Sequence, residues 1–429
     1  MPRRRSYYLA GLTLLAALAV PAWIWLVANP GGETARIKQR LARHFDVESP
    51  AFARQLGLLL GPAFVGGNDV KLLRNGAEIF PAMLAAIDAA QVSVTFETYI
   101  YWSGEIGKQF ADALSDRARR GIAVHVLLDW VGSAKMDQAL LDEMVAAGVE
   151  IRRFHRPHWT NIDRLNNRTH RKLLVVDGRI GFTGGVGIAT QWTGNAQDPD
   201  HWRDSHFLLT GPAVAQMQAT FMENWTKETG KVLYGERYFP VLTRTGDTPA
   251  QVFSSSPGGG SESMQLMYLL AITAATRSID LSAAYFVPDA QSVEALLAAL
   301  KRGVRIRIIV PGEHIDSEIV RKASRVRWGP LLENGATIAE YRPTMYHCKV
   351  MVVDEYLVSV GSTNFDNRSF KLNDEATLNI LSHAFATEQV QVFERDLAQA
   401  RAVSYQEWLD RPLHEKVQER LASLLGSQL

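Results

Sequence analysis

The chain has 429 residues, which is enough for one large domain or for two lobes built from similar halves. Its 46 basic and 45 acidic residues give a formal net charge of +1, so it lacks the strong positive charge typical of nucleic-acid-binding proteins. The only cysteine is Cys348, which excludes an intramolecular disulfide.

The N-terminal stretch from residue 7 to residue 28 contains no charged side chain. A helix needs about 20 apolar residues to cross a bilayer, so this stretch predicts a transmembrane anchor. A cleaved signal peptide, with residues 17–19 as the cleavage signal, is the alternative. The arginines at 3–5 favour an N-terminus inside the cell and a catalytic part outside, although basic residues soon after the segment weaken that asymmetry. Residues 33–46 are expected to form an amphipathic helix on the membrane surface.

The rest of the chain contains an internal duplication. Each copy has a β-rich run ending in aromatic residues, then a helix and a strand, and then a second helix and strand. Strands that alternate with helices predict an α/β fold, and two such halves are expected to pack about a pseudo-twofold axis. One site can then take residues from both halves. The matching segments are 92–102 with 278–288, 110–130 with 296–312, and 140–157 with 331–343.

This duplication gives a domain plan. The Pro-, Gly- and Ser-rich stretch 248–263 marks the joint between the halves. The apolar stretch 52–64 is expected either as a buried helix or as a membrane-contacting one. Thirteen positions separate Pro157 from His170, but four separate Pro343 from His347, so the first copy has nine extra residues, either a substrate-shaping loop or a neutral insertion. The predicted parts are an anchor (1–30), a juxtamembrane helical region (31–70), a first half (71–247), a second half (248–403) and a helical tail (404–429).

A histidine and a lysine, two residues apart, are found at corresponding places in both copies. The patterns are His170-x-Lys172 followed by Asp177, and His347-x-Lys349 followed by Asp354. Each pair is expected at the start of an apolar strand, with both side chains on one face. Histidine can be a nucleophile or a proton carrier, and lysine suits a phosphate oxygen. Two such pairs predict phosphoryl transfer in which one histidine attacks phosphorus and the other protonates the leaving alcohol. No metal site is expected, because the lysines would repel a cation and no further ligand set is near.

These two motifs resemble the paired HKD motifs of the phospholipase D superfamily. The resemblance extends over residues 70–410, and "YFVPD", "YRPTMYHCKVMVVD", "GSTNFDNRSFKLNDE", "HRKLLVVDGRIGFTGG" and "HWRDSHFLLTGPAV" look like bacterial cardiolipin synthases. It implies two phospholipase D-like α/β/α halves behind an N-terminal membrane helix.

The resemblance also implies roles for individual residues. His170 and His347 would be the nucleophile and the general acid/base, with His170 the favoured nucleophile, while Lys172 and Lys349 would hold the phosphate. Asp177 and Asp354 belong to the signature, but a structural role in turn or salt-bridge contacts is expected for them. Gly187 stands where the family's first motif usually continues to an asparagine, so one amide donor fewer is expected in the first half. The supporting residues would be Asn364 on the phosphate, Glu375 on a catalytic imidazole, Asp204 as its counterpart in the first half, and Gly185 and Ser362 in the turns that follow the motifs.

The leading expectation is a phosphatidyltransferase that converts two phosphatidylglycerol molecules into cardiolipin and glycerol through a phosphohistidine, without a cofactor. The alternatives are a phospholipase D that transfers the phosphatidyl group to water, a membrane-tethered nuclease of the same superfamily, and a catalytically dead lipid-binding protein. The expected partners are a phospholipid and a membrane, with no nucleic acid. The expected location is the inner membrane of a bacterium, with the catalytic part on the periplasmic side.

Overall fold

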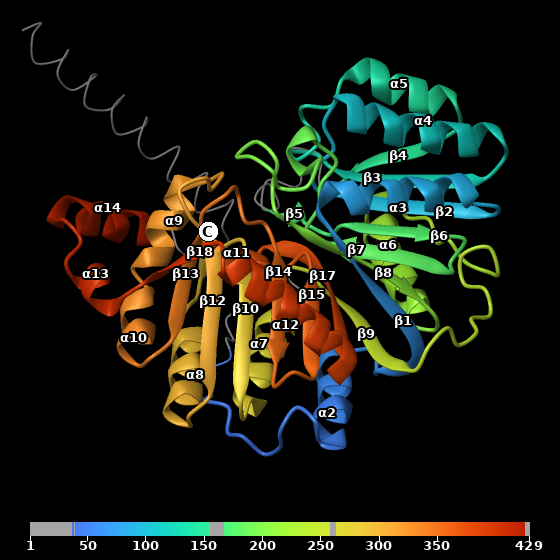
Figure 1. The fold of residues 1–429 in the computed structure, drawn as a ribbon. Coiled ribbons are helices and arrows are strands. Elements are labelled where there is room, and N and C mark those ends of the chain that lie inside the picture. The colour runs from blue at the N-terminus through green and yellow to red at the C-terminus, as the bar shows by residue number, and fades with distance from the viewer. Residues whose placement is uncertain (1–36, 38, 155–166, 258–262, 425–429) are drawn as a thin grey trace, which may run out of the picture.

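The computed structural model describes residues 37, 39–154, 167–257 and 263–424 (Figure 1). The expected anchor at 7–28, part of the expected helix at 33–46 and most of the extra residues before His170 lie outside the described residues. Among the helices that are described, none combines the length and the apolar character needed to cross a bilayer.

The first half alternates strands and helices as the duplication predicts. Its helices are α3 (Asn75–Ala89), α4 (Glu105–Arg119), α5 (Gln138–Ala146), the short 3₁₀ helix η2 (Thr190–Trp192) and α6 (Val214–Thr229). Its strands are β1 (Val65–Arg74), β2 (Ser93–Thr98), β3 (Ala123–Asp129), β4 (Glu150–Phe154), β5 (Arg168–Thr169), β6 (Leu173–Val176), β7 (Ile180–Gly184) and β8 (Ser205–Thr210).

The second half repeats this order. Its helices are α7 (Ser263–Ala274), α8 (Ala290–Lys301), α9 (Glu318–Arg325), α10 (Trp328–Glu333), α11 (Asn367–Lys371), α12 (His383–Leu397), α13 (Tyr405–Leu409) and α14 (Leu413–Ser423). Its strands are β9 (Thr248–Ser255), β10 (Ser278–Ala283), β11 (Phe286–Val287), β12 (Arg305–Pro311), β13 (Thr337–Tyr341), β14 (Lys349–Val353), β15 (Leu357–Gly361), β16 (Phe365–Asp366), β17 (Asn373–Leu381) and β18 (Ala400–Val403).

One continuous sheet runs through both halves. Its order is β18-β13-β12-β10-β14-β15-β17-β9-β1-β8-β7-β6-β2-β3-β4. The antiparallel β9–β1 pair lies at the centre of this order. Counted outward from it, each strand of the second half has a counterpart in the first half, and only the edge strand β18 has none. The pseudo-twofold axis therefore passes between β1 and β9. Figure 1 shows the two halves side by side, with helices on both faces of the sheet.

Each His-Lys motif precedes a short β-hairpin of the same construction. The residues of β6 and β14 are all buried, as their apolar sequences predict. The turns that follow contain residues with positive φ, Asp177 (52°) and Gly178 (63°) in one half and Asp354 (53°) and Glu355 (52°) in the other. Two consecutive positive φ values suit the right-handed twist of a tight hairpin, and aspartate tolerates this region better than most residues.

The joint between the halves differs from a simple turn-rich connection. Residues 248–255 form β9, which pairs with β1 on one side and with β17 on the other. Pro249 is tolerated because it lies where the β1–β9 register shifts, between the paired residues Thr248 and Ala250, and beyond the end of the pairing with β17. The stretch does connect the halves, but it does so as a largely buried strand in the middle of the sheet.

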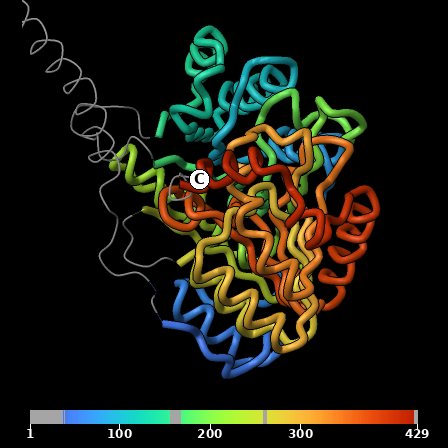
Figure 2. Tube along the Cα trace, turned by 90° about the vertical axis from the view of Figure 1, so that its left-hand side faces the viewer, coloured from blue at the N-terminus to red at the C-terminus, as the bar shows by residue number. Residues whose placement is uncertain are grey.

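The stretch 52–64 is largely the helix α2 (Pro50–Leu60), which packs against α7 of the second half. Phe52, Leu56 and Leu60 are buried there, whereas Leu58 and Leu59 are exposed. In Figure 2 this helix, in blue, lies against the yellow segments of the second half. One face of the stretch is thus a buried helix face, as one of the two interpretations expected.

Candidate active site

The two histidines lie just before the hairpins rather than within the strands. His170 follows β5 and precedes β6, and Lys172 comes immediately before β6. His347 lies two residues before β14, and Lys349 is the first residue of that strand. All four side chains, called the His–Lys cluster below, are almost fully buried. Each lysine bends back, so that its Nζ donates to the carbonyl oxygen of its own histidine at 2.8 Å.

Each histidine takes its carboxylate partner from the opposite half. His170 Nδ1 lies 3.0 Å from Glu375 Oε1 and 3.1 Å from Oε2. His347 Nδ1 lies 2.7 Å from Asp204 Oδ2. A carboxylate accepts hydrogen bonds, so Nδ1 carries the proton in both rings and Nε2 is left with a lone pair. Each carboxylate therefore serves the histidine on the other side of the pseudo-twofold axis.

Backbone contacts explain this exchange. β5 pairs in parallel with the start of β17, and the N–H of His170 donates to the carbonyl of Asp374 at 2.9 Å. In the other half, the N–H of His347 donates to the carbonyl of Arg203 at 2.8 Å. In each case the residue that follows this carbonyl in the sequence carries the carboxylate that accepts from the imidazole. A two-residue strand pairing at His170 and a single bridge between Arg203 and Tyr346 at His347 are thus enough to set each histidine beside a carboxylate of the opposite half.

Burial makes both imidazoles neutral when no phosphate is bound. It lowers the pKa of His170 to about 4, with Glu375 opposing the shift and Lys172 adding to it. It lowers the pKa of His347 to about 3, with a contribution from Lys349 and opposition from Asp204. Near pH 7 either neutral ring can act as a nucleophile or a base.

The lysines are arranged for an anion. Burial and the charge of Lys349 lower the pKa of Lys172 to about 7. Burial also lowers the pKa of Lys349. Burial and the repulsion between two ammonium groups both disfavour the charged form of lysine. A negative charge placed between the two groups therefore stabilises that form strongly. In the described residues, no three His, Cys, Asp or Glu side chains converge in a way that would hold a metal ion.

The two carboxylates are supported differently. Ser362, in the turn after β15, donates its hydroxyl to Glu375 Oε2. The corresponding residue after β7 is Gly185, where a Cβ atom would lie 2.2 Å from Asp204 Oδ1. In that half Asp204 Oδ2 instead accepts from Trp192 Nε1 at 2.9 Å. A serine hydroxyl in the second half and an indole N–H in the first half thus each donate a hydrogen bond to the carboxylate that orients a histidine.

Trp192 also explains the glycine at position 187. A Cβ atom there would lie 2.7 Å from Ile100 Cβ and 3.1 Å from the Trp192 ring. The indole packs edge-on against His347, with ring centroids 5.3 Å apart. An asparagine side chain at 187 would collide with this packing. In the first half the space of an asparagine side chain is therefore taken by the Trp192 ring, whose N–H donates to Asp204.

Asn364 occupies the position of the second half that corresponds to Gly187. It is buried, and its N–H donates to Ser369 Oγ at 3.1 Å. Its side-chain oxygen is buried with no hydrogen-bond partner among the described residues. A buried amide with an unused acceptor is poised for an additional partner.

Asp177 and Asp354 lie away from the His–Lys cluster, at the far ends of β6 and β14. Asp177 accepts from the backbone N–H groups of Gln91, Val92 and Ser93 at 2.7–3.2 Å. Asp354 accepts from the N–H groups of the corresponding loop at 2.7–2.9 Å. Neither aspartate joins the catalytic groups, although both belong to the motif. Their carboxylates accept from the loop backbone and, in the case of Asp354, also from the hydroxyl of Thr276.

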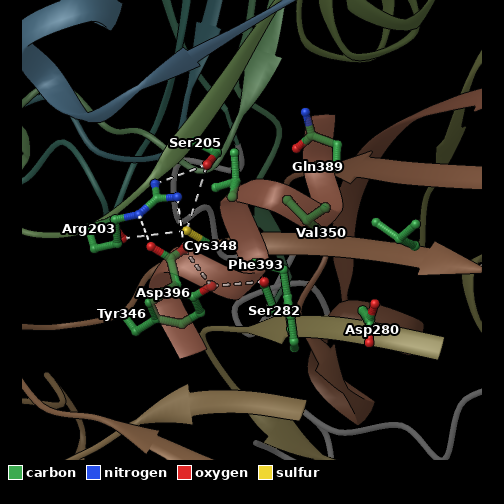
Figure 3. Close-up of a pocket in the computed structure, with 12 residues that line it drawn as sticks. Arg203, Ser205, Asp280, Ser282, Tyr346, Cys348, Val350, Gln389, Phe393 and Asp396 are labelled. Atoms are coloured by element: carbon green, nitrogen blue, oxygen red, sulfur yellow. Dashed lines mark hydrogen bonds and ion pairs between the residues drawn. The ribbon is translucent and has the colours of Figure 1, made fainter. Parts of the chain in front are cut away.

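Figure 3 shows a network of buried polar groups that includes Tyr346 and Cys348, the two neighbours of His347 in the chain. Arg203 forms two hydrogen bonds with Asp396, at 3.0 and 2.9 Å, and also donates to the carbonyl of Asp204. Tyr346 donates to Ser282 Oγ at 2.8 Å. The network encloses a cavity of about 10 Å³, room for about one water molecule, so it supports the site and does not bind a lipid.

The sequence did not single out the aromatic side chains around the site. Tyr99 packs edge-on against His170 at 5.2 Å, and Trp202 lies 5.5 Å from His347. Tyr99 directly follows β2, and Trp202 directly precedes Arg203 and Asp204. Only their place next to recognised residues could have marked them, because an aromatic residue in such a stretch is usually part of the core.

Known proteins resemble this chain over most of its length. A family profile described as "Cardiolipin synthase, PLD-like domain" matches residues 83–225 and 268–397. A "Cardiolipin synthase" of Geobacillus kaustophilus (strain HTA426) is 35% identical over 363 residues, which is 83% of this chain and 72% of that protein. The "Major cardiolipin synthase ClsA" of Bacillus subtilis (strain 168) is 33% identical over 366 residues, 85% of this chain and 76% of that protein.

The fold is also found among solved structures. The crystal structure titled phosphatidylserine synthase of Haemophilus influenzae Rd KW20 aligns with a TM-score of 0.64 and 13% identity, over 88% of this chain and 99% of that one. At this identity the likeness concerns the fold alone. The sequence relatives and the family profile together show that the chain belongs to the cardiolipin synthase family of phospholipase D-type phosphatidyltransferases.

Proposed function

We propose that the chain transfers a phosphatidyl group from one phosphatidylglycerol to the glycerol of a second, which gives cardiolipin and free glycerol. The observation that supports this most directly is the crossed arrangement of the His–Lys cluster, in which each imidazole is oriented by a carboxylate of the other half. Two equivalent imidazoles suit a reaction whose two steps are chemically the reverse of each other. The names of the relatives agree with this reaction.

In the first step His170 Nε2 attacks phosphorus, and the bond from phosphorus to the headgroup glycerol oxygen breaks. His347, protonated once the phosphodiester charge has entered and raised its pKa, gives its proton to the departing glycerol. In the second step His347 takes a proton from the glycerol hydroxyl of the acceptor lipid. That oxygen attacks phosphorus, the bond to His170 breaks, and cardiolipin leaves.

The environments of the two rings support His170 as the nucleophile. In the described part of the chain no group donates to Nε2 of His170, whereas Lys349 Nζ lies 3.2 Å from both ring nitrogens of His347. A free lone pair is needed for attack, and a ring beside an ammonium group is suited to exchanging a proton. In this proposal Lys172 and Lys349 neutralise the phosphoryl oxygens, the side-chain N–H group of Asn364 donates to one of them, and Glu375 and Asp204 orient the rings.

Incubation of the purified full chain with phosphatidylglycerol, followed by mass spectrometry of the lipids, tests this proposal. Cardiolipin together with free glycerol is expected. Phosphatidic acid would indicate that water is the acceptor and that the chain is a hydrolase, and unchanged lipid would contradict both.

The paired-histidine mechanism has its own test. His170→Ala and His347→Ala should each lower the rate at least about 10³-fold. Label from the phosphatidyl group should be trapped on protein in wild type and lost in His170→Gln. A chelator should leave the rate unchanged, because the proposed steps use only side chains of the chain. Substantial turnover in either alanine variant would contradict the mechanism.

A further inference from the structure

The C-terminal helix α14 has its apolar residues on the outside. Leu413, Val417, Leu421 and Leu424 are exposed, Leu413 to 77% and Leu421 to 61%. They recur at spacings of four, four and three residues and therefore form one stripe along the helix, called the α14 stripe below. A helix at the surface of a soluble domain normally turns such a stripe inward.

The acidic residues of α14 are on its inner face. Glu415 pairs with Arg325 of α9 at 3.3 Å, and Glu419, which is buried, pairs with Arg411 at 2.8 Å. Ala422 is buried in an apolar cluster with residues of α9. This face thus uses its negative charges internally, in contacts that hold α14 on the second half.

The exposed charges of α14 are basic, whereas Glu415 is only partly exposed. Lys416 is exposed although its Nζ donates to the carbonyl of Leu409 at 2.6 Å. Lys416 and Arg420 are both exposed and lie along one side of the α14 stripe at helical spacing. An apolar stripe beside lysine and arginine, with the acids turned away, is the pattern of a helix that lies in the interface of an anionic bilayer. A protein partner could also bury the leucines of the stripe. The exposed lysine and arginine beside them favour a negatively charged lipid surface as the partner.

A series of contacts leads from α14 to Asp316, whose negative charge acts on Lys349 of the His–Lys cluster. α9, on which α14 packs, begins two residues after Asp316, whose carboxylate accepts from Tyr285 Oη at 2.8 Å. Tyr285 directly precedes β11, which lies against the same cluster as Ala422. Figure 1 shows α14 and α9 on the left-hand side of the molecule, at about the height of β5, the strand that precedes His170 in the chain.

We propose that the α14 stripe docks on the surface of an anionic phospholipid bilayer and holds the second half, which carries His347 and Lys349, against the membrane that contains the substrate. The inference rests on the proposed function for the identity of the lipid. The leucines enter the acyl boundary, and Lys416 and Arg420 contact the lipid phosphates.

Position-specific fluorescence tests the docking without depending on activity. Because Cys348 is buried, a single dye can be placed on Leu421→Cys in the full chain, reconstituted in vesicles of phosphatidylglycerol and phosphatidylcholine. Val232→Cys is the matched control, because Val232 is exposed to 60% and lies in the first half. Lipids brominated in their acyl chains should quench the dye at 421 and leave the dye at 232 unquenched.

Three outcomes would overturn the proposal. Equal quenching at 421 and 232 would mean that the α14 stripe has no special contact with lipid. Quenching that bromination does not change, but that depends on the protein-to-lipid ratio, would indicate a second copy as the occupant. A dye at 421 that is shielded from both brominated lipid and aqueous iodide would mean that another segment of the chain covers it.

Kinetics separate this inference from the proposed function. The variant Leu413→Gln/Leu421→Gln/Leu424→Gln should lose at least about tenfold in rate on vesicles and keep its rate on short-chain phosphatidylglycerol dispersed as monomers. Lys416→Gln and Arg420→Gln should each weaken docking about fivefold on anionic vesicles and leave docking on pure phosphatidylcholine vesicles unchanged. If the wild type formed no cardiolipin from either substrate, the proposed reaction would fail, while the fluorescence result would still decide on the docking.

Discussion

Lys172 lies in a buried site next to Lys349, and both features disfavour its charged form. Burial and Lys349 lower its pKa to about 7, so in the free enzyme a rising pH removes the proton that a phosphate needs. Once an anionic phosphodiester is bound, it favours the charged form and raises this pKa again. The effect of pH should therefore be larger on substrate capture than on turnover of bound substrate.

We predict that kcat/KM for phosphatidylglycerol falls as the pH rises above about 7, the pKa of Lys172 in the free enzyme, and that kcat falls only at higher pH. Lys172→Arg should remove the upper decline of kcat/KM, because a guanidinium stays charged, although its different shape should lower the plateau. Initial rates across pH measure both constants, and Lys71→Arg, at an exposed position on β1, is the control. A wild-type kcat/KM that stays level to high pH would contradict this role.

Position 187 shows how one missing side chain shapes the first half. Its glycine makes room for Trp192, which in turn holds Asp204. The structure thus supplies a reason for the departure from the family pattern: the indole and the asparagine would compete for one space.

Gly187→Ala should lower the free energy of unfolding by about 1–3 kcal/mol, because its Cβ would press on Ile100 and on the Trp192 ring. Thermal unfolding measures this change, and Gly66→Ala, where an added Cβ meets nothing within 4 Å, is the control. Trp192→Phe should keep the fold and lower kcat, because Asp204 loses a donor that helps to orient His347. Equal melting of the two glycine variants would argue against a packed site at 187.

At the level of the elements, the two hairpins that follow the motifs are fastened in the same way. Asp177 and Asp354 each tie a hairpin turn to the loop that starts the neighbouring strand, β2 in one half and β10 in the other. The motif aspartates thus fix the strands on which the His–Lys cluster depends. They act through the backbone at the opposite end from the chemistry.

Asp177→Ala and Asp354→Ala should each cost about 1–3 kcal/mol of stability, because three backbone N–H groups lose their acceptor. The folded fraction should keep kcat within a few-fold of wild type, in contrast to His170→Ala. Denaturant unfolding and active-site titration measure the two quantities, with the exposed Asp69→Ala as the control. A 10³-fold loss of kcat in a fully folded Asp177→Ala protein would place this residue in the chemistry instead.

At the level of the whole molecule, neither half contains a complete site. The nearer carboxylate in sequence to His170 is Asp204, yet the ring bonds to Glu375 across the axis, and Asp204 serves His347. The β1–β9 pair joins the halves into one sheet and fixes this exchange. The catalytic unit is therefore the full duplicated domain.

Proton-detected NMR of ¹⁵N-histidine can test the crossed pairing. Glu375→Gln should shift the resonances of His170 and leave those of His347 in place, and Asp204→Asn should do the reverse, because each replaces the charged acceptor of one Nδ1–H by a neutral amide. His170→Gln and His347→Gln assign the signals. A shift of the His170 resonances in Asp204→Asn, with none in Glu375→Gln, would show pairing within one half.

The duplication, the α/β order and the His-Lys pairs could be predicted from the sequence, because apolar periodicity and repeated spacing are local properties. β9 was misleading for the same reason: its flanking prolines, glycines and serines are typical of a connection, and only pairing with β1 and β17 makes it a central strand. Trp192 gave no signal, because its role depends on a glycine five residues earlier and on an aspartate twelve residues later.

The sequence by itself determined that two His-Lys pairs exist, that each precedes a buried hairpin, and that the chain is built from two similar halves. Only the tertiary structure decided which carboxylate orients which histidine, how Trp192 takes the place of a missing amide, and which face of α14 points outward. Local sequence specifies strands and turns through side-chain size and backbone preference. The pairing of distant strands about the pseudo-twofold axis is settled by long-range packing, and that packing brings the two halves of the site together.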